Sequence, residues 1–158
     1  MPLPHTPAAA PIARTLVRAA LTAFPRTEPG LGHDRPRPSP TDRDLAELLT
    51  AELVANAVEH TSPHAPLELV LEVLPTSLRV EVHDHDPTPL PGLTGAGSPE
   101  HRDPLSERGR GLSLVRELSS SAGCRTTELG KVVWFRLSLA PGSRTRVTRT
   151  SSREKEAG

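Results

Sequence analysis

The chain has 158 residues, of which 35% are hydrophobic and 24% are charged, so we expect one domain with one hydrophobic core. Its 19 basic and 19 acidic residues balance, which excludes a global basic field that would hold nucleic acid or an anionic membrane. A single cysteine, Cys124, cannot form an internal disulfide, and this favours the cytoplasm over secretion. No run approaches the roughly 18 apolar residues that a membrane span needs, so we expect a soluble protein.

The N-terminal region predicts a short tail over residues 1–11, followed by an amphipathic helix over residues 12–24. Apolar side chains recur there at helical spacing, at Ile12, Leu16, Val17, Ala20, Leu21 and Phe24. Arg14 and Arg18 interrupt the apolar run, which argues against a signal peptide. Both lie on the other, exposed face of the helix and are therefore candidates for contact with a partner. The following stretch, Thr27 to Pro40, holds four prolines and two glycines and predicts an irregular connection.

The middle of the chain predicts a second helix and a hairpin. Thr41 or Asp42 can cap this helix, which should run to about His60 because Pro63 ends it. Residues 67–73 and 78–83 then predict two strands, the second with clear alternation, joined by a turn over 74–77.

The last third begins with a proline-rich segment over residues 87–108 that is too long for a simple turn and predicts a functional loop. A third helix follows Gly111, with Leu112, Val115 and Leu118 on its inner face. Strands over 124–129 and 132–139 form a second hairpin around Gly130, and residues 141–158 predict a charged tail. The order predicts an α+β fold over residues 12–140, a two-layer sandwich with helices on one face of a mostly antiparallel sheet.

Two polar residues of the second helix fall within its leucine stripe. At about 100° per residue, Glu52 and Asn56 project into the middle of the face formed by Leu45, Leu48, Leu49 and Leu53. One interpretation is a structural network in which both side chains bond to backbone at a sheet edge. The other is a wet ligand cavity, in which an amide oxygen and a carboxylate suit Mg²⁺ and Glu52 can deprotonate a hydroxyl.

Two further signals lie at the ends of predicted elements. The strand over 78–83 delivers Asp84 to the sheet end, where polar side chains often reach ligands. A metal cluster over residues 83–86 is a rival interpretation, but consecutive strand residues point to opposite faces. The third helix opens with Gly109, Arg110, Gly111 and Leu112, where glycines let backbone amides approach a phosphate.

Four blocks in this order resemble the ATPase superfamily of gyrase, the heat-shock chaperone, histidine kinases and mismatch-repair proteins (GHKL). The blocks are Glu52-Leu-Val-Ala-Asn56-Ala-Val-Glu-His60, Val80-Glu-Val-His-Asp84, Arg108-Gly-Arg-Gly-Leu-Ser-Leu-Val115 and Gly130-Lys-Val-Val-Trp134. Within this superfamily the chain is most similar to stand-alone bacterial anti-sigma factor serine/threonine kinases. The resemblance implies a Bergerat-type ATP-binding sandwich, with ATP between the helices and a lid over about 87–108.

The resemblance also implies roles for single residues. Asn56 would hold Mg²⁺, Glu52 would be the general base, and Asp84 would receive the adenine amino group. Gly109 and Gly111 would hinge the lid and, with Arg110 and Leu112, bring backbone amides to the phosphates.

The sequence departs from the family pattern in two places. The first glycine box of the family usually continues from its aspartate as Asp-x-Gly, whereas here Asp86 stands at the glycine position and Pro87 follows. The proline-rich stretch Thr27 to Pro40 is an insertion between the first two helices.

Three functions remain open on this basis. The first is a cytoplasmic ATP·Mg²⁺-dependent kinase that phosphorylates a serine or threonine of a protein antagonist, with a sigma factor or an anti-anti-sigma protein as partner and a homodimer as assembly. The second is a non-catalytic switch in which ATP orders the lid and shapes a partner surface. The third is a metal-binding or structural interaction domain that binds no nucleotide.

Overall fold

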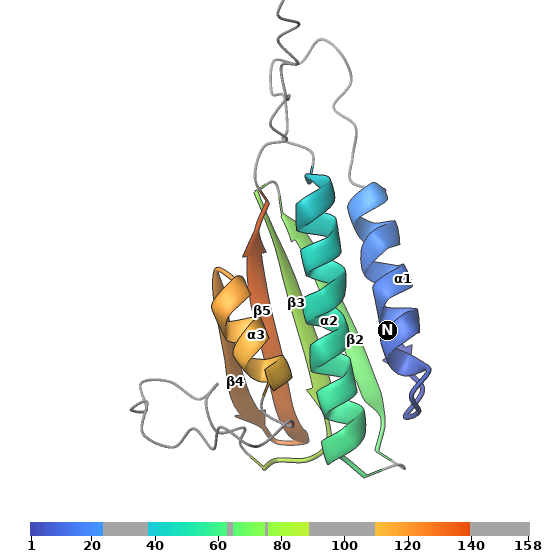
Figure 1. Ribbon diagram of the computed structural model, residues 1–158. Helices are drawn as coiled ribbons and strands as arrows, with labels where there is room; N and C mark the ends of the chain where they lie inside the picture. The colour runs from blue at the N-terminus through green and yellow to red at the C-terminus, as the bar shows by residue number, and fades with distance from the viewer. Residues whose placement is uncertain (24–37, 63–64, 75, 89–109, 140–158) are drawn as a thin grey trace, which may run out of the picture.

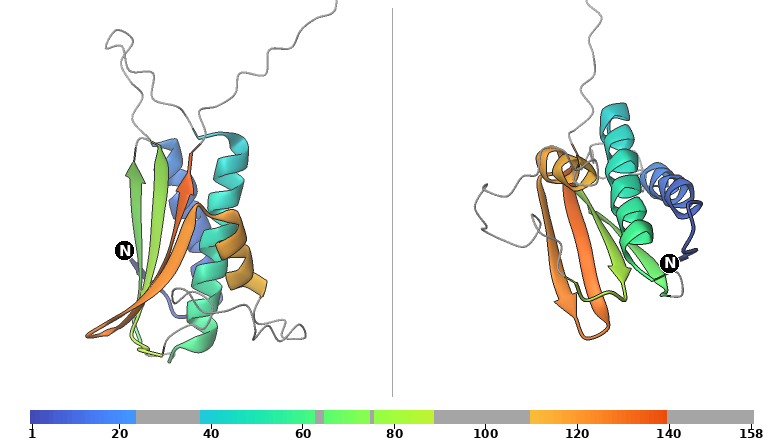
Figure 2. Two further views of the ribbon diagram at one scale, coloured as in Figure 1. Left: turned by 90° about the vertical axis from the view of Figure 1, so that its left-hand side faces the viewer. Right: turned by 60° about the horizontal axis from the view of Figure 1, so that its bottom comes forward.

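The computed structural model describes residues 1–23, 38–62, 65–74, 76–88 and 110–139. Within these ranges three helices pack on one face of a five-stranded sheet, and Figures 1 and 2 show the two layers from three sides. The predicted α+β sandwich is therefore confirmed. The predicted C-terminal tail, nearly all of the predicted lid and most of the Thr27 to Pro40 connection lie outside the described residues.

The sheet is antiparallel at every described strand pair and has the order β1-β2-β3-β5-β4. Its strands are β1 Pro2–Leu3, β2 Leu67–Leu74, β3 Ser77–Asp84, β4 Ser121–Thr127 and β5 Gly130–Ser138. Both predicted hairpins are confirmed. Strand β1 was not predicted, because a two-residue strand carries no alternation that a sequence pattern could reveal.

The register of the sheet separates an inner face from an outer face. On the inner face Val80 pairs with Phe135 and Val82 with Val133, and all four side chains are buried under the helices. The next inward pair along the same two strands is Asp84 with Lys131, which is also buried. The apolar layer therefore ends, at one edge of the sheet, in a pair of opposite charges.

Helix α1 (Ala9–Thr22) buries Ala9, Ala13, Val17 and Leu21. The prediction started this helix too late and assigned Ile12 to the inner face, whereas Ile12 is 40% exposed. The small residues Ala9 and Ala13 set the inward phase because they recur four residues apart with Val17 and Leu21, on one face of the helix. Phe24 lies outside the described residues.

Helix α2 (Pro40–His60) begins with a capping box, in which the Ser39 hydroxyl accepts from the Asp42 N–H (3.1 Å) and the Asp42 carboxylate accepts from the Ser39 N–H (3.0 Å). The predicted cap at Thr41 or Asp42 was therefore wrong. Proline at the first helical position, Pro40, needs no N–H partner, so the helix starts there. Its predicted end at His60 is confirmed.

The buried sector of α2 differs from the predicted leucine stripe. The buried side chains are Ala46, Glu47, Leu49, Thr50, Ala51, Leu53, Val54 and Ala57. Leu48 is 37% exposed, and Glu52 and Asn56 are half-buried at the border of this sector rather than in its middle. The buried sector differs from the predicted stripe because α2 packs against three neighbours at once: α1, α3 (Arg110–Leu118) and the sheet. None of the described helices is long and apolar enough to cross a membrane.

An ion pair joins the first two helices. Arg18 on α1 donates two hydrogen bonds to Glu47 on α2, at 2.7 and 2.6 Å, and Glu47 is buried. Such a two-pronged bond is the strongest geometry for this pair. Arg18 is thus engaged within the fold, which leaves only Arg14 of the two arginines as a candidate for a partner contact.

We predict that this pair makes stability depend on pH. Hydrogen bonds from Arg18 hold the pKa of Glu47 below its ordinary value of 4.5, so the bond stabilises the folded chain above that pH. This stabilisation is lost as the pH falls through the lowered pKa. Glu47→Gln should therefore lower the melting temperature by a few degrees at pH 7, and the difference from wild type should vanish in acid.

Thermal melts of both proteins from pH 3 to pH 7 measure this, with Glu117→Gln on an exposed position of α3 as the control. A Glu47→Gln deficit that stays constant down to the lowest pH would contradict the assignment.

Candidate functional site

The end of α2, the start of α3 and the end of β3 lie at the same end of the sandwich, at the bottom of Figure 1. These are the elements that carry the predicted site residues. Glu52 and Asn56 lie one turn apart on α2, both half-buried. Neither side chain forms a hydrogen bond or ion pair with another described residue, so both remain available to a ligand.

Gly111 in the first turn of α3 lies directly against Glu52. A Cβ on Gly111 would collide with Oε2 of the Glu52 carboxylate, so a larger residue here would have to displace the end of the Glu52 side chain. Leu112, the next residue, is partly buried against the core and anchors the turn. Arg110 begins the helix, and Gly109 lies outside the described residues.

Asp84 is the most enclosed of the predicted site residues. Its side chain is 0% exposed, and its Oδ1 lies 3.1 Å from the Lys131 ammonium and accepts from the Asp86 N–H at 2.9 Å. Its Oδ2 is buried without a hydrogen-bond partner among the described residues. A buried carboxylate oxygen left unpaired is costly, and such atoms in native proteins commonly mark a ligand position.

Gly130 explains how the β4–β5 turn reaches Asp84. A Cβ on Gly130 would collide with the Asp84 carbonyl oxygen and the His85 backbone, and the residue has a φ of 155°. Only glycine adopts this conformation without strain. The turn therefore closes on the end of β3 and brings the next residue, Lys131, beside the carboxylate.

Lys131 is the site residue that the sequence interpretation missed. It is 2% exposed and is among the largest fully buried side chains of the described chain. A signal was present, because Lys131 directly precedes the strand predicted over 132–139 and continues the inward alternation of Val133 and Phe135; the observed strand begins earlier, at Gly130. A lysine at an inward position needs a carboxylate partner, and Asp84 is its nearest one.

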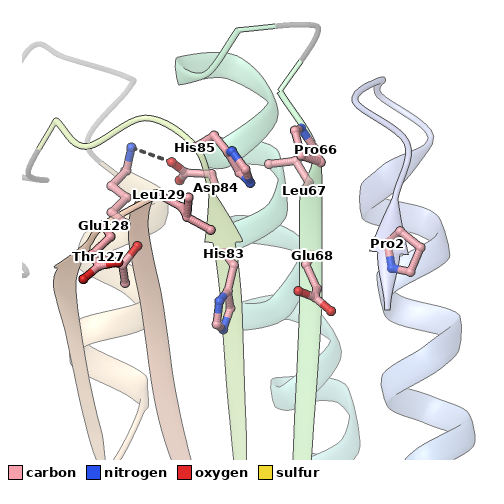
Figure 3. Close-up of a pocket in the computed structure, with 11 residues that line it drawn as sticks. Pro2, Pro66, Leu67, Glu68, His83, Asp84, His85, Thr127, Glu128 and Leu129 are labelled. Atoms are coloured by element: carbon pink, nitrogen blue, oxygen red, sulfur yellow. Dashed lines mark ion pairs between the residues drawn. The ribbon is translucent and has the colours of Figure 1, made fainter.

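A cavity of about 640 Å³ opens beside Asp84 and Lys131 (Figure 3). It lies at the end of the sheet between the start of β2 and the β4–β5 turn, and Figure 3 marks the Asp84 ion pair with a dashed line. Its lining includes His83, His85 and Glu68 but neither Glu52 nor Asn56. The hollow therefore reaches the Asp84 part of the predicted site and not the part on α2.

The rival metal cluster receives no support from the geometry. His83 lies on the outer face of β3, where its Nε2 is 2.9 Å from Oε2 of Glu81, whereas Asp84 points inward. Across the described parts of the chain, no group of three or more histidine, cysteine, aspartate or glutamate side chains could hold a metal ion.

A comparison with known families agrees with the fold. The family of histidine kinase-like ATPase domains matches residues 4–137, and the chain belongs to this family. A search of curated proteins finds no match. Membership indicates an ATP-binding domain of the GHKL type.

Two features of the site are compatible with a bound nucleotide. The unpartnered Oδ2 of Asp84 can accept a hydrogen bond from the base, and the first turn of α3, with Gly111 against Glu52, has backbone N–H groups without partners within the helix. Asn56 supplies an amide oxygen of the kind that Mg²⁺ binds, one turn from the Glu52 carboxylate.

We predict that Asp84 matters to stability in a way that Glu52 and Asn56 do not. Asp84→Ala leaves the Lys131 ammonium without its nearest carboxylate, which should cost about 3 kcal/mol of unfolding free energy. Glu52→Ala and Asn56→Ala remove half-buried groups without protein partners and should stay within about 1 kcal/mol of wild type.

Urea unfolding of the three variants measures the difference. Adding Lys131→Met to Asp84→Ala should restore part of the loss, since both charges are then gone. An Asp84→Ala protein as stable as wild type would show that the pair contributes nothing to the fold.

Proposed function

We propose that this chain is a cytoplasmic ATP-dependent serine/threonine protein kinase of the anti-sigma factor type, which phosphorylates a protein antagonist and acts as a homodimer. The observations that carry the proposal are the contact of Gly111 with Glu52 and the unpartnered oxygen of Asp84, on elements that meet at one end of a histidine kinase-like ATPase fold. A sigma factor and an anti-anti-sigma protein are the proposed partners.

Each residue has a role that its position supports. Mg²⁺·ATP supplies the γ-phosphoryl group and a cation that neutralises its charge. Asp84 accepts a hydrogen bond from the adenine amino group through Oδ2, and the start of α3, from Arg110 to Leu112, faces the phosphates. Asn56 provides an oxygen ligand for the cation, and Glu52 accepts the proton of the attacking hydroxyl.

The Glu52 carboxylate is suited to a general base by its surroundings. It is half-buried, lies at the border of the apolar sector of α2, and has no cation bound to it among the described side chains. A carboxylate that is already paired with a lysine or arginine is a weaker proton acceptor. Glu47, one helical turn and a half earlier, is paired with Arg18 and is excluded from this role by that bond.

Two variants test these roles, because one should lose phosphoryl transfer and the other should lose affinity for Mg²⁺·ATP. Glu52→Ala should lower phosphoryl transfer by roughly 10²- to 10⁴-fold while leaving the Kd for ATP within about twofold, because the general base acts on the hydroxyl and not on the nucleotide. Asn56→Ala should weaken Mg²⁺·ATP binding by roughly tenfold, because the cation loses an oxygen ligand, and should change Mg²⁺-free binding little.

Transfer is measured with γ-labelled ATP and the partner protein, and binding by calorimetry, with Glu59→Ala on the same helix as the control. Full transfer by Glu52→Ala would remove the general base assignment. ATP binding by wild type without any transfer to the partner would instead support the non-catalytic switch. No binding of ATP at all would contradict both functions.

The contact between Gly111 and Glu52 provides a second test. Gly111→Ala should keep the stability within about 1 kcal/mol, since alanine favours a helix and only the mobile end of Glu52 has to move. The displaced carboxylate would then be misplaced for proton transfer, and the rate should fall at least roughly tenfold.

Thermal melts and the transfer assay are run together, with Ser113→Ala at an exposed position of α3 as the matched control. A Gly111→Ala protein with unchanged transfer would show that the position of Glu52 is not set by this contact.

A further inference from the structure

Lys131 is a buried cation that the proposed roles do not use. Taking an ammonium group out of water costs several kcal/mol unless nearby acceptors replace the lost water. The surroundings of Lys131 supply such acceptors from two residues, both at the end of β3. Because Lys131 lines the cavity beside Asp84, where we propose that the adenine amino group binds, it can act on the ligand as well as on the core.

Three oxygen atoms of Asp84 and Asp86 lie close to the Lys131 ammonium. Its Nζ lies 3.1 Å from Oδ1 of Asp84, 3.0 Å from the Asp86 carbonyl oxygen and 3.4 Å from Oδ2 of Asp86. The contact with the Asp86 carbonyl is a hydrogen bond, and the two carboxylate contacts are ion pairs. Lys131 therefore places its charge against Asp84 and Asp86.

Asp86 is itself held in place for this contact. Its Oδ1 accepts from the Thr88 N–H at 3.0 Å and from the Thr88 hydroxyl at 2.7 Å, which leaves Oδ2 to face Lys131. These Thr88 bonds, aided by Lys131, also lower the pKa of Asp86. The residue that stands where the family has glycine thus serves as the second anchor of the lysine.

Asp84 is left with one defined free oxygen. Lys131 and the Asp86 N–H both lie against Oδ1, and the hydrogen bond of Lys131 to the Asp86 carbonyl holds the ammonium on that side of the carboxylate. The buried Oδ2 is consequently the acceptor that Asp84 has left for a ligand.

We infer that Lys131 is a positioning residue that engages Oδ1 of Asp84 and leaves Oδ2 as the acceptor for the ligand. In this way it selects a purine with an amino group over one with an oxo group at the same position. The inference rests on the proposed ATP-binding function. An amino group donates to Oδ2, whereas an oxo group would place two acceptor oxygens against each other in a buried site. Without Lys131 the carboxylate can turn, so that neither of its oxygens is held in a fixed position toward the ligand.

The test compares Mg²⁺·ATP with Mg²⁺·ITP, which differ in this one group, by calorimetry on the full chain. Wild type should bind ATP roughly 10- to 100-fold more tightly than ITP, as expected for one hydrogen bond to a charged group. In Lys131→Met the ratio should fall below about fivefold, and Lys131→Arg should restore most of it because arginine keeps the charge and the donors. Arg125→Met, which removes a cation from the outer face of the neighbouring strand, should leave the ratio unchanged.

Lys131→Gln covers the case in which Lys131→Met does not fold, because glutamine keeps two donors without the charge, and it should also lower the ratio. A wild-type preference for ATP that either neutral variant retains in full would overturn the positioning role and leave the proposed function standing. Wild type that binds ATP and ITP equally would overturn the selectivity alone. Wild type that binds neither would overturn the proposed function and this inference with it.

Discussion

The buried contact between Asp84 and Lys131 is the interaction on which the site depends. The inner face of the sheet is apolar along β3 and β5 until this pair, so the two charges sit where the hydrophobic layer stops. Neither charge could remain there alone, because an isolated ion in a dry interior is strongly destabilising. Their pairing lets the core end in a polar group that keeps one oxygen free.

Three backbone constraints bring the remaining residues to this pair. The β3–β5 register sets Asp84 opposite Lys131, and Gly130 allows the β4–β5 turn to close on the end of β3. On the helix side, Gly111 lets α3 approach Glu52 on α2. The geometry of the site therefore depends on two glycines at which a side chain would collide with a neighbour, as much as on the polar residues themselves.

Much of the fold could be predicted because its long elements carry strong periodic patterns. The alternation of β3 and the run of apolar residues in α2 gave their ends to within a few residues. What failed depended on tertiary contacts. The face of α1 that packs against the core includes Ala9 and Ala13, which are too small to dominate a hydrophobic pattern. Strand β1 is defined by its pairing with β2, which no local pattern reveals.

The candidate site was predictable in its residues but not in its connections. The i, i+4 spacing of Glu52 and Asn56 and the position of Asp84 after a strand could be read directly from the sequence. The pairing of Asp84 with Lys131, 47 positions apart in the numbering, requires knowledge of which strands are neighbours. Asp86 looked like the loss of a glycine, and only the structure shows it as an anchor of Lys131.

Hydrogen–deuterium exchange of the full chain with and without Mg²⁺·ATP tests the central claim most directly, namely that α2, α3 and β3 form one nucleotide site at their shared end. The account predicts added protection in the last turns of α2, the first turn of α3 and the residues after β3, with the β2–β3 turn over 74–77 unchanged. Protection confined to other elements, or none at saturating nucleotide, would contradict it.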